Sequence, residues 1–233
     1  MDNTKQKHIV ISLGGSLIVP DTVDTYFVIS FKKCIEKLIK DEGYTFTLFT
    51  GGGSVCRTYI EALDVVDRTK TRDDKDWIGI AITKVNALFL KTVFGDLAYD
   101  EIVTDPNHIP ETVKPIVIGS GWKPGWSTDY DAVLFAHAIG VTRVINLSNI
   151  SHVYTKDPRK YNDAIKIEKV TWSEYRKIIP DSWEAGLHSP FDPVASKFAE
   201  ESSMTVAILD GRNIDELEKA IRDLPFEGTN ITP

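Results

Sequence analysis

The sequence predicts an α/β protein, a three-layer α/β/α sandwich with a mainly parallel central sheet. Two observations support this. Short apolar, β-branched runs alternate with helical patterns along the chain, and a glycine turn directly follows three of these runs. Such alternation favours parallel strands covered by helices on both faces. The chain has 233 residues, 42% of them apolar, which is enough for one large core. We therefore expect a single domain spanning residues 1–233.

Three strand–glycine–helix units are predicted in the first part of the chain. Their strands are rich in β-branched and aromatic residues, and their helices show one apolar face. The strands are residues 8–13, 44–50 and 115–118, and the glycine turns are 14–16, 51–54 and 119–125. Helices are expected at 25–40 (stopped by Gly43), from 55, at 77–93 and at 132–138, with Ser127 or Thr128 as the cap of the last and a charged, solvated connection at 64–75.

The remaining third continues the same alternation. A strand at 143–147 leads into a polar, loop-like stretch at 148–160. After it we expect a short helix at 172–179 that Pro180 closes, a helix around 191–198, a strand at 204–209, a helix at 214–221 and a short final strand at 228–232.

The glycine turns are the predicted binding elements. In parallel sheets, ligands bind beyond the carboxyl ends of the strands, and all three turns and the stretch that begins at Ser148 lie there. Backbone N–H groups at a strand–glycine–helix junction can bind an anion. Both the Gly-Lys-Ser/Thr phosphate loop and the dinucleotide fingerprint are missing. Separate anion-binding turns suit a protein that places two phosphorylated molecules end to end, as phosphoryl transfer requires.

Composition excludes several other classes. The net charge of -7 and pI of about 5.3 argue against a nucleic-acid duplex as partner. Two cysteines cannot make a disulfide framework or a zinc site. No apolar run is expected to reach membrane-spanning length, and the polar start of the chain does not resemble a signal peptide. We expect a cytoplasmic protein without a membrane partner.

Six segments in order resemble the motifs of the amino-acid-kinase superfamily, and their spacing is most similar to its archaeal-type uridylate (UMP) kinase branch. The likeness covers essentially the whole chain. The segments are VISLGGS at 10–16, GGGSVCR at 51–57, DWIGI at 76–80, KPGWSTD at 123–129, VYTKDP at 153–158 and FDPVASK at 191–197.

This resemblance implies transfer of the ATP γ-phosphate to UMP with Mg²⁺, giving UDP in pyrimidine biosynthesis. It implies an acceptor-binding part at about 1–140, an ATP-binding part at about 141–233, and a homo-oligomer, a hexamer in relatives. A homo-oligomer also agrees with Tyr26, Val28 and Ile29, which lie beyond the main apolar face of their helix.

The resemblance also implies site residues, with no metal-ligand set supplied by the protein alone. Asp129, Arg57 and Lys197 are the expected catalytic residues. Asp129 would organise the catalytic cations, although a helix-cap charge is the plain alternative, and for Asp76 that alternative is an N-cap. The ATP residues would be Gly14, Gly15, Ser16, Gly53, Arg57, Ser148, Asn149, Tyr154 and Asp157. The UMP residues would be Gly52, Asp76, Trp122, Lys123, Pro124, Gly125, Trp126, Ser127 and Thr128.

Three positions depart from the family pattern. Ser12 stands where many relatives have a lysine, so another cation must act, Lys197 or Lys123. Ser151-His152 replaces an Asp-Gly pair, and His152 is expected to be structural. Trp126 replaces a small or polar residue and could stack on a base or pack. The alternatives are a sister kinase of isopentenyl phosphate, carbamate or an amino acid, and a non-catalytic nucleotide-binding storage or sensor protein.

Overall fold

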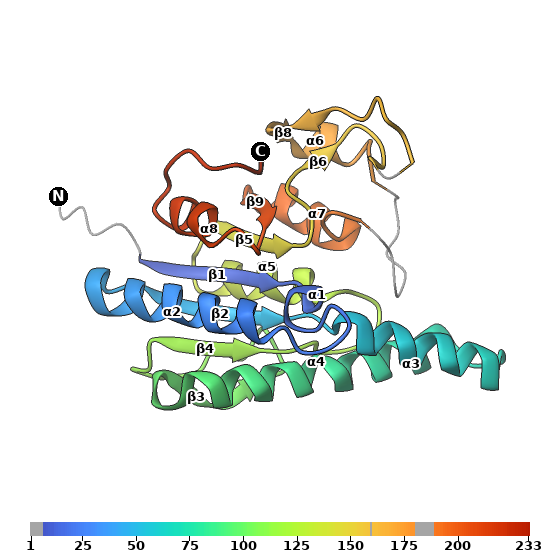
Figure 1. Cartoon of the computed structure of the whole chain (residues 1–233), viewed down its shortest axis with the longest axis horizontal. Coiled ribbons are helices and arrows are strands. Elements are labelled where there is room, and N and C mark those ends of the chain that lie inside the picture. The colour runs from blue at the N-terminus through green and yellow to red at the C-terminus, as the bar shows by residue number, and fades with distance from the viewer. Residues whose placement is uncertain (1–6, 159, 180–188) are drawn as a thin grey trace.

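The computed structural model describes residues 7–158, 160–179 and 189–233. An eight-stranded sheet runs through this part of the chain in the order β3-β4-β2-β1-β5-β9-β10-β8, beside a hairpin of β6 and β7 (Figure 1). The strands are β1 His8–Leu13, β2 Thr45–Thr50, β3 Ala98–Val103, β4 Ile116–Gly119, β5 Arg143–Ser148, β6 Val153–Tyr154, β7 Lys166–Ile167, β8 Lys169–Thr171, β9 Thr205–Asp210 and β10 Thr229–Thr232.

Two helical layers cover the sheet, which confirms the three-layer sandwich. Alternate strand residues face opposite layers: Ile11 and Leu13 pack with α1, α2, α4 and α8, whereas Val10 packs with α5, α6 and α7. The helices are α1 Gly15–Ile18, α2 Thr25–Glu42, α3 Gly53–Val66, α4 Arg72–Phe94, α5 Thr128–Ala138, α6 Trp172–Tyr175, α7 Pro193–Glu201 and α8 Ile214–Ile221, with a 3₁₀ turn at Gly95–Leu97.

The sheet is parallel except where β10 runs antiparallel to β9. The strands β4, β2, β1 and β5 are neighbours, and in Figure 1 their arrowheads point toward the side where α1 and α3 begin. The three glycine turns and the Ser148 stretch therefore start from one edge of the sheet, as predicted.

The helices at 53–94 differ from the prediction. The charged stretch at 64–75 is mostly helical: α3 continues to Val66 and α4 begins at Arg72, with only a short connection between them. Thr71 is the N-cap of α4, and it forms a capping box with Asp74. Asp76 therefore lies inside α4, and the N-cap interpretation of Asp76 is wrong.

Several short elements were not predicted from the sequence. β3 at the sheet edge follows α4 after the 3₁₀ turn, and β6 lies inside the stretch predicted as a loop. The helix expected at 172–179 ends at Tyr175, and the one expected around 191–198 begins at Pro193, where Asp192 caps it through Ala195 N–H. The predicted stop at Pro180 lies outside the described residues.

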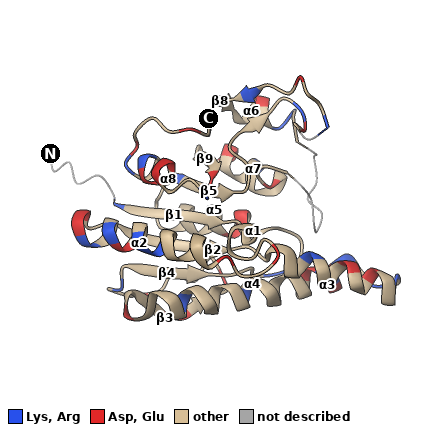
Figure 2. Ribbon diagram, in the orientation of Figure 1, with Lys and Arg blue, Asp and Glu red and all other residues tan. Residues whose placement is uncertain are grey.

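The described chain contains one segment, Arg72–Leu97, that by length and composition alone could cross a membrane, contrary to the sequence expectation. It comprises α4 and the 3₁₀ turn, and α4 packs against β2, β3 and β4 as a layer helix does. In Figure 2 the positions of charged residues colour the ribbons of the outer helices α2, α3 and α8, while the central strands are almost entirely tan.

Candidate active site

Two glycine turns interlock at the carboxyl ends of β1 and β2. A Cβ on Gly15 would lie 2.1 Å from the backbone N of Gly53, so only glycine permits this approach. Gly53 has φ of +72°, which also favours glycine. Gly14 N–H donates to Leu147 O (2.8 Å), which ties the first turn to the end of β5. No described side chain caps the N-terminus of α3, so this end of the helix favours an anion.

Arg57 extends from the first turns of α3 toward the other glycine turn. Its Nη1 lies 3.3 Å from Ser16 Oγ on α1 and donates to it. The guanidinium is thus held next to both turns, on the side where predicted ATP residues Gly14, Gly15, Ser16 and Gly53 gather. A fixed guanidinium beside backbone N–H groups is a suitable arrangement for a phosphate chain.

Asp129 lies at the start of α5, beneath the ends of β1 and β5. Its Oδ1 accepts hydrogen bonds from Ser12 Oγ (2.6 Å) and from Asn146 Nδ2 (2.8 Å), and its Oδ2 accepts from Asp192 N–H (3.3 Å). Ser12 and Asn146 are register partners on the adjacent strands β1 and β5. The serine that replaces the family's lysine is therefore bonded directly to this carboxylate.

Burial raises the pKa of Asp129 from its ordinary value of 3.8 to about 6, and the charge of nearby Asp192 acts in the same direction. The three hydrogen bonds act against that shift but do not cancel it. Near neutral pH the carboxylate is mainly ionised, yet within the described chain no lysine or arginine is among its hydrogen-bond partners. Asp129 therefore offers a negative charge that a bound cation would stabilise.

Asp76 reaches from α4 toward the loop that joins β4 to α5, residues 120–127, which we call the acceptor loop. Its Oδ2 accepts from Gly125 N–H (2.9 Å). Its Oδ1 is buried and has no hydrogen-bond partner among the described residues. Burial raises the pKa of Asp76. An unpaired, buried carboxylate oxygen costs free energy unless a ligand supplies a donor, so this atom is a candidate binding point.

The acceptor loop carries an aromatic cluster. The rings of Trp122 and Trp126 lie 5.6 Å apart, and the Lys123 ammonium lies 3.9 Å from the first ring centre and 4.8 Å from the second. Trp126 also packs edge-to-face on Tyr130 at 4.9 Å, so it packs within the fold. Ser127 caps α5 through Asp129 N–H, as predicted, and Thr128 is the first residue of α5. Pro124 precedes Gly125 within the loop.

The predicted adenosine-binding residues lie at and beyond the end of β5. Ser148 Oγ accepts from Ile150 N–H (3.2 Å), and Asn149 O accepts from Arg212 Nη2 (3.2 Å). Tyr154 Oη and Ser151 Oγ share a hydrogen bond of 3.3 Å, and Asp157 lies in the loop after β6.

His152 is buried, and its Nδ1 has no partner within the described residues. Its ring meets that of Tyr154 edge-to-face at 6.4 Å.

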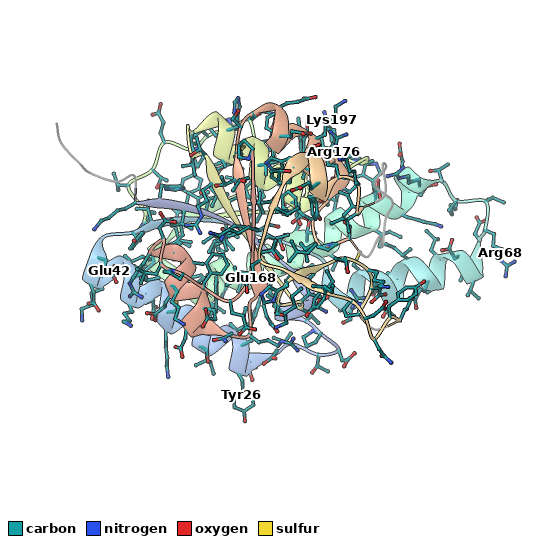
Figure 3. All side chains as sticks on the ribbon, turned by 90° about the horizontal axis from the view of Figure 1, so that it is seen from above. Tyr26, Glu42, Arg68, Glu168, Arg176 and Lys197 are labelled. Atoms are coloured by element: carbon teal, nitrogen blue, oxygen red, sulfur yellow. The ribbon has the colours of Figure 1, made fainter. Side chains whose placement is uncertain are left out.

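Lys197 is not brought to this cluster. Its side chain is 63% exposed and forms an ion pair with Glu201 (3.9 Å) along α7. Figure 3 shows it at the outer edge of the molecule, close to Arg176. The side of α7 that faces inward carries Ser196 instead, which is fully buried.

Four polar residues were missed by the sequence analysis. Asn86 donates to Gly51 O (2.7 Å) and so supports the second glycine turn from α4. Asn146, Asp131 and Asp192 hold Asp129 or the acceptor loop. Their positions in or beside apolar runs indicate burial, and a buried polar residue needs a hydrogen-bond partner, although the sequence does not show which one.

Comparisons with known proteins identify the family of this chain. A model of the amino acid kinase family matches residues 7–210. The uridylate kinase of Pyrococcus abyssi is 32% identical over 228 residues, which cover 97% of this chain and 99% of that protein, and the one of Methanocaldococcus jannaschii is 32% identical over 87% and 90%.

Solved structures give the same result. The uridylate kinase from Archaeoglobus fulgidus superposes with a TM-score of 0.80 at 26% identity, over 96% of this chain and 99% of that one. A UMP kinase from Bacillus anthracis, at 17% identity with a TM-score of 0.75 over 97% and 96%, shares the fold. This chain belongs to the amino acid kinase family.

Proposed function

We propose that this protein is a uridylate kinase that transfers the γ-phosphoryl group of ATP to UMP, giving ADP and UDP. The interlocking glycine turns at the ends of β1 and β2 carry this proposal, because they bring two anion-binding backbone segments into contact. The full-length similarity to proteins named uridylate kinase supports UMP as the acceptor.

On the ATP side, Gly14, Gly15, Ser16 and Gly53 would bind the phosphates. Arg57 would neutralise the charge that develops on the transferred group, which a guanidinium does well in a site without water. The adenosine would contact four residues at and beyond the end of β5, namely Ser148, Asn149, Tyr154 and Asp157.

On the acceptor side, Gly52 would contact the UMP phosphate. The residues from Trp122 in the acceptor loop to Thr128 at the start of α5 would surround the nucleotide. Asp76 Oδ1 would accept hydrogen bonds from the ribose hydroxyls. That role is supported by its burial and by its lack of a donor within the described residues.

Mg²⁺ would accompany ATP and neutralise its phosphates. Among the described residues no group of three or more acidic, histidine or cysteine side chains could hold an ion alone. The ion would be bound mainly by phosphate oxygens, with Asp129 as the nearby carboxylate that organises cations. Lys123 is our candidate for the cation that replaces the missing lysine, since Lys197 faces solvent.

A homo-oligomer remains our proposal, and the location in the cytoplasm stays a prediction. Exposed apolar side chains support self-association: Tyr26 is 86% exposed and points away from α2 in Figure 3, and Val65 and Val66 at the end of α3 are both 82% exposed. Val28, which was predicted to join Tyr26 and Ile29 on this surface, is buried instead.

A coupled ADP-release assay tests the proposal. The assay offers UMP, dUMP, CMP, isopentenyl phosphate, carbamate and aspartate in turn, each with Mg-ATP. We expect the highest kcat/KM with UMP. A higher value for another acceptor would identify a sister kinase. Tight ATP binding without ADP release for any acceptor would identify a non-catalytic nucleotide-binding protein.

A further inference from the structure

Asp131 lies behind the acceptor loop and is 1% exposed. Its two carboxylate oxygens accept from two different points of the loop. Oδ1 accepts from the indole Nε1–H of Trp126 (3.1 Å), and Oδ2 accepts from the backbone N–H of Trp122 (3.3 Å). One side chain on α5 thus joins residues four apart in the loop and fixes the spacing between them.

The other hydrogen bonds of the acceptor loop hold its backbone, whereas Asp131 also holds one of its side chains. Gly121 N–H donates to Thr83 Oγ1 (2.9 Å), Gly125 N–H to Asp76 Oδ2 (2.9 Å) and Ser127 N–H to Asp192 Oδ2 (3.2 Å). These bonds fix the backbone at three places. The bond from Trp126 to Asp131 instead holds an aromatic side chain of the loop, so Asp131 is the group that orients that ring.

The orientation of these rings determines where Lys123 lies. Its ammonium contacts the faces of both Trp122 and Trp126, so a change in either ring would move the charge. Tyr130 supports Trp126 from behind, at 4.9 Å, and Phe198 supports Tyr130 at 5.7 Å. The Lys123 side chain therefore rests on two tryptophan rings, and Asp131 holds one of them, Trp126, through a hydrogen bond.

A role in packing alone accounts poorly for this carboxylate. Burial raises the pKa of the Asp131 carboxyl group well above its ordinary value, and the charges of Asp192 and Asp105 act in the same direction, so placing an acid here is costly. An apolar side chain at this position would avoid that cost and still pack behind the loop. What it could not do is accept two hydrogen bonds at once from Trp122 and Trp126.

We propose that Asp131 is the positioning residue of the acceptor loop, which sets the spacing of Trp122 and Trp126 and thereby seats Lys123 against the acceptor. The inference rests on the proposed kinase function and deepens it. Asp131 itself touches neither substrate. Its effect is on the affinity for the acceptor, while ATP binds to elements that Asp131 does not contact.

Four variants test this. Asp131→Ala removes both hydrogen bonds, and Asp131→Asn keeps only one, because an amide can accept at one end and donates at the other. Trp126→Phe removes the indole donor and keeps a ring. Tyr130→Phe is the matched control, since it keeps the ring behind Trp126 and both bonds to Asp131.

We expect the KM for UMP to rise about tenfold or more in Asp131→Ala, which loses both hydrogen bonds, and less in Asp131→Asn, which loses one. The KM for ATP should stay within about twofold, and Tyr130→Phe should behave as wild type. Asp131→Ala combined with Trp126→Phe should cost less than the sum of the two single changes, because each of them removes the hydrogen bond between Trp126 and Asp131.

A ligand-free measurement tests the contact itself. In ¹⁵N-labelled protein, Trp126→Phe assigns the Trp126 indole signal, and its exchange with solvent should be slow in wild type and faster in Asp131→Ala. Unchanged indole exchange, an unchanged KM for UMP, or equal rises in both KM values would each overturn the proposal. Activity with a different acceptor only would refute UMP alone, and the KM comparison then uses that acceptor. No activity with any acceptor overturns both proposals.

Discussion

Replacing Asp129 with asparagine should stabilise the fold at alkaline pH and abolish turnover. Wild-type Asp129 is an ionised carboxylate held among Ser12, Asn146 and the Asp192 N–H, with no basic side chain of the described residues bonded to it. Asparagine has the same size and no charge. The variant therefore removes the cost of burying an anion, and also the charge that the proposed mechanism uses to organise cations.

The magnitude follows from the pKa of Asp129, which burial raises from 3.8 to about 6. Because the folded state binds this proton more tightly than the unfolded state, the contribution to stability falls as pH rises from 3.8 to 6 and is lowest above 6. Two units correspond to about 3 kcal/mol at pH 8. All three partners of Asp129 are hydrogen-bond donors, so the amide N–H₂ group of asparagine would face either the Asp192 N–H or the donors of Ser12 and Asn146. This donor–donor contact costs about 1 kcal/mol of folding free energy.

We therefore expect Asp129→Asn to be about 2 kcal/mol more stable than wild type at pH 8, and about 0.5 kcal/mol less stable near pH 4. Urea unfolding at pH 8, 6 and 4 measures both proteins, and taking the difference cancels the titration of other groups. An advantage of the variant that does not change with pH would refute the reasoning. For activity, the wild-type kcat should fall below about pH 6 as Asp129 is protonated.

Other predictions concern the remaining residues. Arg57→Ala should lower kcat roughly 10³-fold with a stability change of about 0.5 kcal/mol or less; normal turnover would make Arg57 a surface charge. In wild type, kcat/KM for UMP should exceed that for dUMP by about 5- to 150-fold. Asp76→Asn should reduce this ratio, chiefly by lowering kcat/KM for UMP, whereas an unchanged ratio would show that Asp76 does not bind the ribose. Lys197→Ala should stay within about twofold of wild-type activity because its side chain faces solvent. Light scattering should give a mass above the 26.1 kDa of one chain, and a monomer at micromolar concentration would contradict the proposed oligomer.

The sequence predicted those parts of the fold whose signals are local. The β-branched runs at β1, β2 and β5 are buried on both faces of a parallel sheet, and such runs are read directly from the chain. The glycine turns were also found, because Gly-Gly directly after an apolar strand is a strong signal for a turn. By contrast, β3 alternates only weakly, since it is an edge strand with two exposed residues in its middle.

The predicted helix boundaries were wrong where the prediction relied on charge composition alone. The stretch at 64–75 is highly charged, which suggested a connection, but Thr71 and Asp74 form a capping box, and α4 begins at Arg72, four residues before Asp76. This four-residue signal was present in the sequence. Charge alone decided the interpretation, although charged residues are also common in the first turn of a helix.

The site was harder to predict because its supporting contacts join residues far apart in the chain. Ser12 and Asp129 are 117 positions apart, and Asp192 and Asp129 are 63 apart. Asp192 was visible only as part of a motif, and its N–H bond to Asp129 follows from the packing of α7 beside α5. Pairing of this kind depends on tertiary packing, so single-sequence patterns do not contain it.

The presence of Ser12, where many relatives have a lysine, affects the pKa of Asp129. A lysine there would place an ammonium beside Asp129 and lower the pKa of its carboxyl group. Ser12 donates one neutral hydrogen bond instead, Asn146 donates another, and the pKa of Asp129 still rises to about 6. The charge of Asp129 is thus left for a cation that comes from outside this pair. Mg²⁺ that arrives with ATP would supply it when that substrate binds. In such a protein, cation binding and substrate binding would be coupled, whereas a resident lysine would neutralise the site permanently.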